Sequence, residues 1–169
     1  MANHPVADNF LAYAAKRMKL SQQQIARCVE RLSEEQMWQR GGDHENSVAK
    51  LLLHLEGNIR QWILHGVDGQ PDVRERDEEF ALTRSVDAGQ ARRAFDAAVD
   101  EAVAVIAALD PQRLLEVIDP QPTGPARHAT ILEAIFKVAG HLEMHTGQII
   151  LLTKQMVASD LDLSMPRKR

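Results

Sequence analysis

The chain has 169 residues, of which 44% are hydrophobic and 26% are charged. These fractions exclude a largely disordered chain, and the length suits a single domain. The formal net charge of −4 predicts no general attraction to nucleic acid or to an anionic membrane. The single cysteine, Cys28, cannot form an internal disulfide, and no uncharged stretch approaches the ~20 residues that a membrane span needs. We therefore expect a cytoplasmic protein without nucleic-acid or membrane partners.

Helical spacing of apolar residues first appears near the N-terminus. It predicts a long helix from about Val6 to Leu32. Cys28 lies beside the apolar stripe of this helix, which indicates a small core residue rather than a nucleophile. Ser33 and Gln36 then have the spacing of a capping box, so we expect a short helical turn that ends at Gly41.

A second long helix is expected from about Ser47 to His65. Asn46 or Ser47 would be its N-cap, and Gly66 would follow it as a left-handed C-terminal residue. The loop from about Val67 to Thr83 is rich in glycine, proline and charged residues. Such charges are typical of a solvated or contact surface, although a loop of this length is often functional and could cover a pocket.

The third helix begins at Ser85 or Asp87 and extends to about Leu109. The next stretch, from Leu114 to Ala129, contains three prolines and a glycine. It predicts an irregular crossover rather than another regular element.

A capping box formed by Thr130 and Glu133 begins the fourth helix, which runs to about Met156. None of the four helices can bury its apolar stripe alone, and no convincing strand alternation occurs. We therefore predict an all-α fold, a four-helix bundle formed by one domain over residues 1–156. Residues 157–169 would form a C-terminal tail, to whose basic end we assign no function.

Two histidines on the fourth helix are candidate metal ligands. His141 and His145 are four residues apart, which places both rings on one helical face with about 5–6 Å between their Cβ atoms. They lie next to apolar positions, so we expect them to face inward. Buried imidazoles need partners. A bound metal would satisfy them, and so would hydrogen bonds within the core.

The second helix supplies a third candidate, His54, a polar residue inside a run of leucines. Three neutral histidines leave coordination positions open, as in catalytic sites. Imidazole binds zinc, nickel, iron, manganese and cobalt, of which we favour zinc or nickel. Asn58 and Gln148, each about one turn from a candidate ligand, could orient that ligand or contact substrate, or could make ordinary interhelical hydrogen bonds.

Other metal and nucleotide patterns are absent. The Glu-x-x-His spacing of di-iron bundles does not occur, and neither does a Walker A or Rossmann glycine pattern. Glu143 lies two residues from each histidine of its helix, so it points to a different face. The remaining histidines lie near helix ends or in loops, where we expect exposure: His4, His44, His65 and His128.

Three sequence blocks occur in a characteristic order. They are LHLEGNIRQW from Leu53 to Trp62, the loop residues Asp68-Gly69-Gln70 with Arg74-x-Arg76-Asp77-x-Glu79-Phe80, and His141-x-x-x-His145-x-Gly147-Gln148-Ile149. Together they resemble the DinB/YfiT-like superfamily, and most closely an uncharacterised branch of it. The resemblance spans about residues 47–152. It implies a four-helix bundle of up-down-down-up topology, a homodimer, and a divalent metal held by His54, His141 and His145.

The resemblance also implies a class of chemistry. Characterised relatives include metal-dependent enzymes that use low-molecular-weight thiols, as transferases or as an isomerase. Relatives commonly have His-His-Arg-Gly-Gln in the last block, whereas Met144 and Thr146 flank His145 here. The three ligands survive this departure, but it leaves the particular thiol and acceptor unassigned.

Three functional hypotheses follow. The first is a metal-dependent enzyme, a thiol S-transferase or a hydrolase, that activates a low-molecular-weight thiol or water for attack on a small electrophile. The second is a non-enzymatic metal- or ligand-binding stress-response bundle, because no carboxylate or hydroxyl general base is evident on the faces of His54 and His141. The third is a dimeric helical scaffold whose histidines only form hydrogen bonds in the core.

Overall fold

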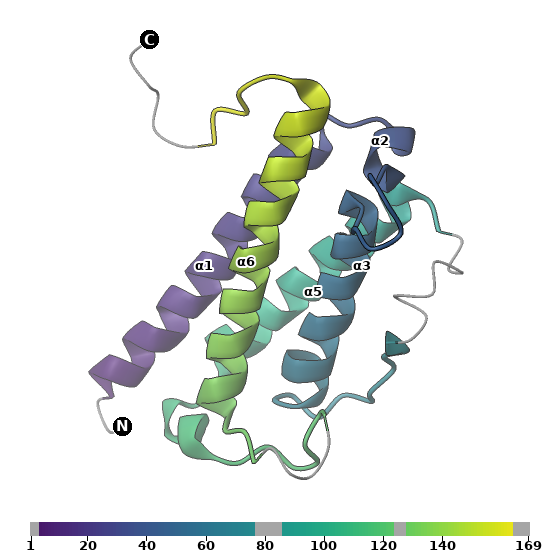
Figure 1. The fold of residues 1–169 in the computed structure, drawn as a ribbon. Coiled ribbons are helices and arrows are strands. Elements are labelled where there is room, and N and C mark those ends of the chain that lie inside the picture. The colour runs from purple at the N-terminus through teal and green to yellow at the C-terminus, as the bar shows by residue number, and fades with distance from the viewer. Residues whose placement is uncertain (1–3, 77–85, 124–127, 164–169) are drawn as a thin grey trace.

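The computed structural model describes residues 4–76, 86–123 and 128–163, and the regular elements in these ranges are helical. Four long helices dominate the fold (Figure 1). They are α1 (Pro5–Val29), α3 (Val48–Ile59) with its continuation η1 (Arg60–His65), α5 (Ala88–Ala108) and α6 (Ile131–Val157). Two short elements, α2 (Glu34–Trp38) and η2 (Pro111–Leu115), lie in the connections. Across the described ranges, every helix is too short or too polar to cross a membrane.

The four long helices surround one apolar core. Helix α1 contacts α5 and α6, and α3 contacts the same two helices. Figure 1 shows that α1 and α6 run in one direction, whereas α3 and α5 run in the other. The core is built mainly from aliphatic side chains, and its largest fully buried members include Met18, Ile25, Leu52, Phe95 and Ile135. Burial of these stripes supplies most of the stability of such helices.

The predicted helix starts are confirmed, and those of α2, α3, α5 and α6 each have a side-chain cap. Ser33 and Gln36 form the expected capping box of α2. Of the alternatives at the next two starts, Ser47 caps α3 and Asp87 caps α5. Thr130 caps α6 through the predicted box with Glu133. Ser85, the other candidate at the start of α5, lies outside the described residues.

One predicted helix end and one predicted backbone conformation are wrong. Helix α1 ends at Val29 rather than Leu32, because the amides of Arg31 and Leu32 bond to carbonyls three residues back and tighten the chain into a turn. Gly66 is not left-handed, with φ −68° and ψ −39°. A Cβ atom on Gly66 would stand 2.7 Å from the carbonyl oxygen of Trp62, so this position suits glycine through close packing rather than through its backbone angles.

The end of the second predicted helix differs in its hydrogen bonding. Residues 60–65 form a π-helix, in which amides bond to carbonyls five residues back, as between the Gly66 amide and the Gln61 carbonyl. Three consecutive side chains of this segment, Trp62, Ile63 and Leu64, are buried. The loop that follows contains the left-handed glycine of this region, Gly69, with φ 77°.

The connection before α6 is irregular over most of the predicted range 114–129, but its first two residues belong to the 3-10 helix η2, which the sequence analysis missed. The Asp110 side chain caps this turn. An isolated bridge pairs Val117 with Thr130 and anchors the connection beside the start of α6. Residues 124–127 lie outside the described residues.

After α6 the described chain continues to residue 163. Leu161 is buried, and the Arg27 guanidinium donates a hydrogen bond to its carbonyl oxygen. This part of the predicted tail therefore packs against the end of α1. The basic residues Arg167, Lys168 and Arg169 lie outside the described residues.

Candidate metal centre

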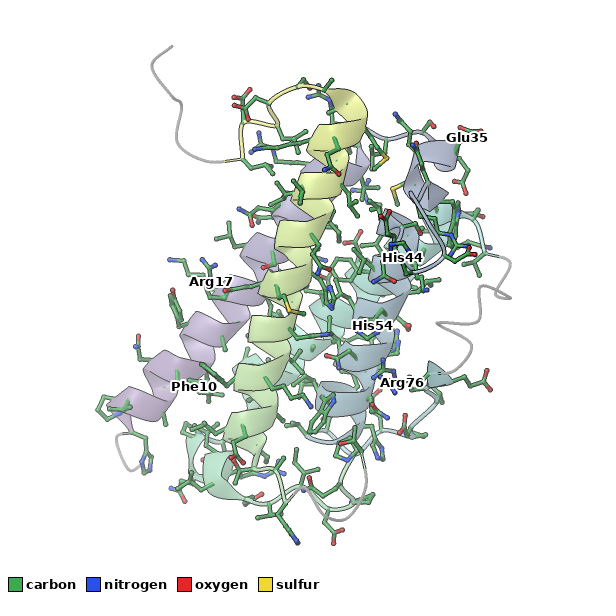
Figure 2. The ribbon with its side chains drawn as sticks, viewed as in Figure 1. Phe10, Arg17, Glu35, His44, His54 and Arg76 are labelled. Carbon is green, nitrogen blue, oxygen red and sulfur yellow. The ribbon has the colours of Figure 1, made fainter. Side chains whose placement is uncertain are left out.

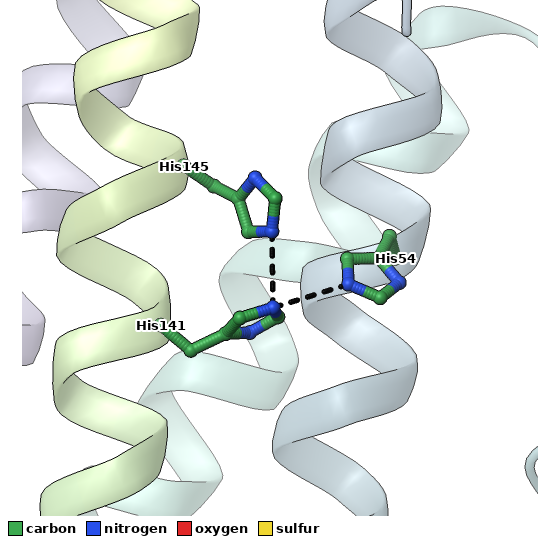
Figure 3. A group of neighbouring side chains, drawn as sticks. All are labelled: His54, His141 and His145. Atoms are coloured by element: carbon green, nitrogen blue, oxygen red, sulfur yellow. Dashed lines mark hydrogen bonds between the residues drawn. The ribbon is translucent and has the colours of Figure 1, made fainter. Parts of the chain in front are cut away.

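The three predicted histidines lie together between α3 and α6. Figure 2 places His54 on α3, and Figure 3 shows its ring facing those of His141 and His145 on α6. Nε2 of His141 stands 3.2 Å from Nε2 of His54 and 3.0 Å from Nε2 of His145. The structure therefore brings one nitrogen of each ring to a common point.

Packing on either side of the histidines fixes this convergence. Leu52 and Leu55 are fully buried around His54, so they set the rotation of α3 about its axis. Val138 and Leu142 do the same for α6. His145 is buried, and the other two histidines are partly buried. Their positions are consequences of core packing on two helices, which makes the cluster rigid.

The separations suit three ligands of one ion. Nitrogens bound to zinc at about 2.0–2.1 Å, at octahedral to tetrahedral angles, stand about 2.9–3.4 Å apart. The two contacts around His141 fall in this range. We searched the described residues for histidine, cysteine and acidic side chains that lie close enough together to hold a metal ion. The group found consists of these three histidines. The donors present fit a divalent cation that accepts imidazole.

A hydrogen bond selects the tautomer of His145. The Gln148 side-chain oxygen lies 2.7 Å from Nδ1 of His145. Because an amide oxygen only accepts, Nδ1 carries the proton and the lone pair of Nε2 points toward the cluster. Gln148 thus acts on a candidate ligand, as the sequence spacing suggested. Its part in metal binding stays a prediction.

His141 is neutral over the physiological pH range. Burial lowers its pKa to about 4, and electrostatic interactions with His145, His54, Arg74 and Lys137 act in the same direction. Burial also lowers the pKa of His145, partly offset by the hydrogen bond that its Nδ1 donates to Gln148. Neutral imidazole is the form that binds metals. The alternative to a bound metal is a proton on Nε2 of His141. This nitrogen would then donate hydrogen bonds to the facing Nε2 atoms of His54 and His145.

Two cationic side chains flank the histidines. A guanidinium nitrogen of Arg74 lies 3.4 Å from Nδ1 of His54, and another donates to the Gln61 side chain at 3.0 Å. The Lys137 ammonium lies 3.6 Å from the centre of the Trp62 ring. The sequence analysis did not assign Lys137 to the site, although its place one turn before His141 puts it on the same helical face.

The predicted loop meets the site through Arg74, whereas Asp77 and Glu79 lie outside the described residues. Asn58 is buried, and its side-chain oxygen accepts no hydrogen bond from the described residues. Glu143 points to another face, as expected, because it pairs with Arg17 of α1. The cluster therefore consists of three imidazole donors with cationic neighbours.

The other histidines are not part of this group. His44 and His128 are exposed, as predicted. His4 and His65 are partly buried, against expectation. Nδ1 of His65 lies 2.6 Å from the Gln70 carbonyl oxygen, which accounts for its inward position at the end of η1.

Fold and site together define an all-helical protein with a three-histidine group that could hold one metal ion. Residues 5–169 match the family described as "Protein of unknown function (DUF1572)". The chain belongs to this family, whose description assigns no activity. None of the curated proteins compared with the chain matches it.

Proposed function

We propose that the chain is a metal-dependent enzyme of the DinB/YfiT-like superfamily, and that its four long helices form the up-down-down-up bundle of that superfamily. His54, His141 and His145 would hold one divalent ion, zinc or nickel by preference, with iron, manganese and cobalt as further candidates. The observation that carries this proposal is the convergence of three Nε2 atoms around His141 at 3.0 and 3.2 Å.

The proposed substrate is a low-molecular-weight thiol, or water, that attacks a small electrophile. When bound, the ion would lower the pKa of such a ligand and supply a nucleophile near neutral pH. The cationic neighbours Arg74 and Lys137 favour an anionic ligand such as a thiolate or hydroxide, because the cluster itself contributes no negative charge. Gln148 would hold His145 in its ligating tautomer, and the buried oxygen of Asn58 could accept a hydrogen bond from substrate.

Metal content is the first test. Untagged protein prepared without chelator would be analysed for bound elements, beside His141→Ala and the exposed-histidine control His44→Ala. We expect about one metal per chain in the wild type and the control, and a loss in His141→Ala. Full stoichiometry and affinity in His141→Ala would exclude the proposed ligand set. A metal-free wild type that takes up none of the five candidate ions would favour the hydrogen-bonded scaffold.

Turnover is the second test. The protein reloaded with each candidate metal would be assayed with several thiols, and with water alone, across a panel of small electrophiles. We expect turnover that disappears in His54→Ala and persists in His44→Ala. An absence of turnover across the panel, with metal fully bound, would exclude the transferase and hydrolase forms of the proposal.

The second candidate is a non-enzymatic bundle that binds a metal or ligand in a stress response. One observation favours it: Glu143, the acidic residue between the two histidines of α6, is engaged by Arg17 on another face. Within the described residues, the metal-binding group contains no carboxylate that could serve as a general base. Metal binding without turnover is the result expected of this candidate.

A further inference from the structure

Arg74 is held against the His54 ring by contacts that lie outside the histidine cluster. Its guanidinium donates a hydrogen bond to the Gln61 side chain at 3.0 Å, and another of its nitrogens lies 3.4 Å from Nδ1 of His54. The Asp72 carboxylate accepts hydrogen bonds from the backbone amide of Arg74 and from the Gln61 side chain, at 3.1 and 3.2 Å. These bonds fix the loop to η1 and keep a positive charge beside Nδ1.

The nitrogen that Arg74 contacts is the one that does not face the other histidines. Figure 3 shows Nδ1 of His54 pointing away from the rings of His141 and His145, toward which Nε2 is turned. A guanidinium carries only N–H donors and keeps its proton in proteins, so it cannot accept a hydrogen bond. A hydrogen bond from Arg74 therefore requires the lone pair of His54 on Nδ1. In a neutral ring the single proton is then on Nε2.

His54 and His145 thus favour protons on opposite ring nitrogens. The Gln148 oxygen holds the proton of His145 on Nδ1, so Nε2 of that ring has a lone pair. Between the two rings lies Nε2 of His141, 3.2 Å from the Nε2 of His54 and 3.0 Å from that of His145. It can accept the proton that His54 offers or donate to the lone pair of His145, but not both. In the metal-free cluster, one of the two contacts therefore pairs like with like.

We propose that Arg74 holds His54 in the tautomer that cannot bind a metal, and that Arg74 withdraws from Nδ1 when the three histidines take up an ion. The inference rests on the proposed function, because it takes His54, His141 and His145 as the ligands. A ligating Nε2 needs its lone pair. The proton of His54 would therefore move through solvent from Nε2 to Nδ1, with no net release. Nδ1 would then face Arg74 as donor against donor, which breaks the contact.

Shared donation within the cluster is the competing arrangement. If Nε2 of His141 donated to both neighbours, His54 would keep its proton on Nδ1, against Arg74. A positive charge held beside an N–H group opposes that arrangement, and the partly buried positions of His54 and Arg74 weaken the screening by water. The bond to Gln61 keeps the charge in place. The position of one proton in the metal-free chain therefore distinguishes the two arrangements.

That proton can be observed directly by nuclear magnetic resonance. In protein labelled with nitrogen-15, ring nitrogens with and without a proton have well-separated chemical shifts, and the signals of His54 are identified by their absence from His54→Gln. In the metal-free wild type at pH 8 we expect the proton of His54 on Nε2. In Arg74→Met, and in the wild type loaded with zinc, it should be on Nδ1. A metal-free wild type with this proton on Nδ1 would overturn the inference.

Metal affinity gives a second, independent measurement. Arg74→Met removes the donor and keeps a side chain of similar length. It should lower the zinc dissociation constant at least tenfold, because metal uptake no longer competes with a hydrogen bond from a charged group. Weaker zinc binding by Arg74→Met would contradict the proposal.

Lys137→Met is the matched control, because it removes an equal charge from the same surroundings. Both Lys137 and Arg74 lower the pKa of His141, but the Lys137 ammonium lies over the Trp62 ring. Its loss therefore measures the electrostatic effect alone, and we expect a smaller decrease in the zinc dissociation constant. Equal decreases in Lys137→Met and Arg74→Met would show that charge, rather than the tautomer of His54, opposes the metal. Circular dichroism would check that both variants keep their helices.

The two measurements separate this inference from the proposed function. Zinc uptake by the wild type and by Arg74→Met, with the His54 proton on Nδ1 throughout, would exclude the proposed role of Arg74 and leave the ligand set intact. An absence of zinc uptake in both proteins would instead exclude the ligand set, and the inference with it.

Discussion

The side-chain oxygen of Gln148 lies 2.7 Å from Nδ1 of His145 and determines which nitrogen of that ring faces the other two histidines. Loss of such a partner of a metal ligand commonly lowers metal affinity 10- to 100-fold. We expect Gln148→Ala to weaken metal binding by about that factor, measured by competition with a chromophoric chelator. Gln155→Ala, an exposed glutamine further along α6, should bind metal like the wild type. Equal affinity in the two variants would show that the hydrogen bond does not orient the ligand.

Metal binding should also raise the thermal stability of the folded protein. A ligand that binds only the folded chain stabilises it by about 2.7 kcal/mol at a concentration 100 times its dissociation constant. We expect the Tm of wild-type protein to rise with added metal. In His54→Ala the rise should be much smaller, because one of the three donors is lost. A metal-dependent rise of the same size in His54→Ala would place the ion elsewhere on the chain.

Stability of the metal-free protein should depend on pH through His141. Its pKa in the folded chain is about 4, whereas the ordinary value is 6.5. Between these values the unfolded chain binds more protons, so stability is full above about pH 6.5 and falls as the pH drops toward 4. The whole shift corresponds to about 3 kcal/mol. Urea unfolding of chelator-treated protein at several pH values would measure it.

The control for this pH dependence is a pair of glutamine variants. His141→Gln removes the titrating ring and should flatten the fall between pH 6.5 and 4. His44→Gln, at an exposed histidine, should leave it unchanged. An equally steep fall in His141→Gln would assign the effect to other groups.

Cys28 should be unreactive in the folded protein. Its thiol is fully buried, and burial raises its pKa, an effect that a hydrogen bond with Thr153 only partly offsets. Since the thiolate is the reactive form, we expect no reaction with a thiol reagent in native buffer and one equivalent in denaturant. Fast stoichiometric labelling in native buffer would contradict this assignment of Cys28 to the core.

Replacement of Gly66 should destabilise the fold. An added methyl group would stand 2.7 Å from the Trp62 carbonyl oxygen and 2.9 Å from a ring carbon of Pro122. We expect Gly66→Ala to cost about 1–3 kcal/mol in the free energy of unfolding. Denaturant unfolding would measure the loss. An unchanged or raised stability would mean that the connection holding Pro122 moves aside easily.

Local signals predicted the helix starts and the candidate ligands well. Capping boxes such as Thr130 with Glu133 act over three residues, so the sequence shows them directly. The spacing of His141 and His145 likewise defines one helical face without tertiary information. The position of His54 inside an apolar run made it a candidate, and the family resemblance grouped it with the other two histidines, beside which the structure places it.

Features that depend on distant contacts were missed. Gly66 packs closely against Pro122, which is remote in sequence, and a local C-cap rule gave the wrong backbone angle for it. The approach of Arg74 to His54 depends on the course of a loop, and the contact of Lys137 with Trp62 joins two helices that are distant in sequence. Neither the π-helical hydrogen bonding nor the 3-10 turn at Pro111 had a periodic signal of its own.

The π-helical end of α3 has the geometry of a helix with one residue inserted. Without the extra residue, every side chain after that point would be turned by about 100° around the helix axis. Trp62, which lies under the Lys137 ammonium, is part of this widened turn. The contact between Trp62 and the Lys137 charge therefore depends on the number of residues in this segment as well as on the residue types. A one-residue deletion between positions 60 and 65 could preserve a continuous helix and still take the Trp62 ring away from Lys137.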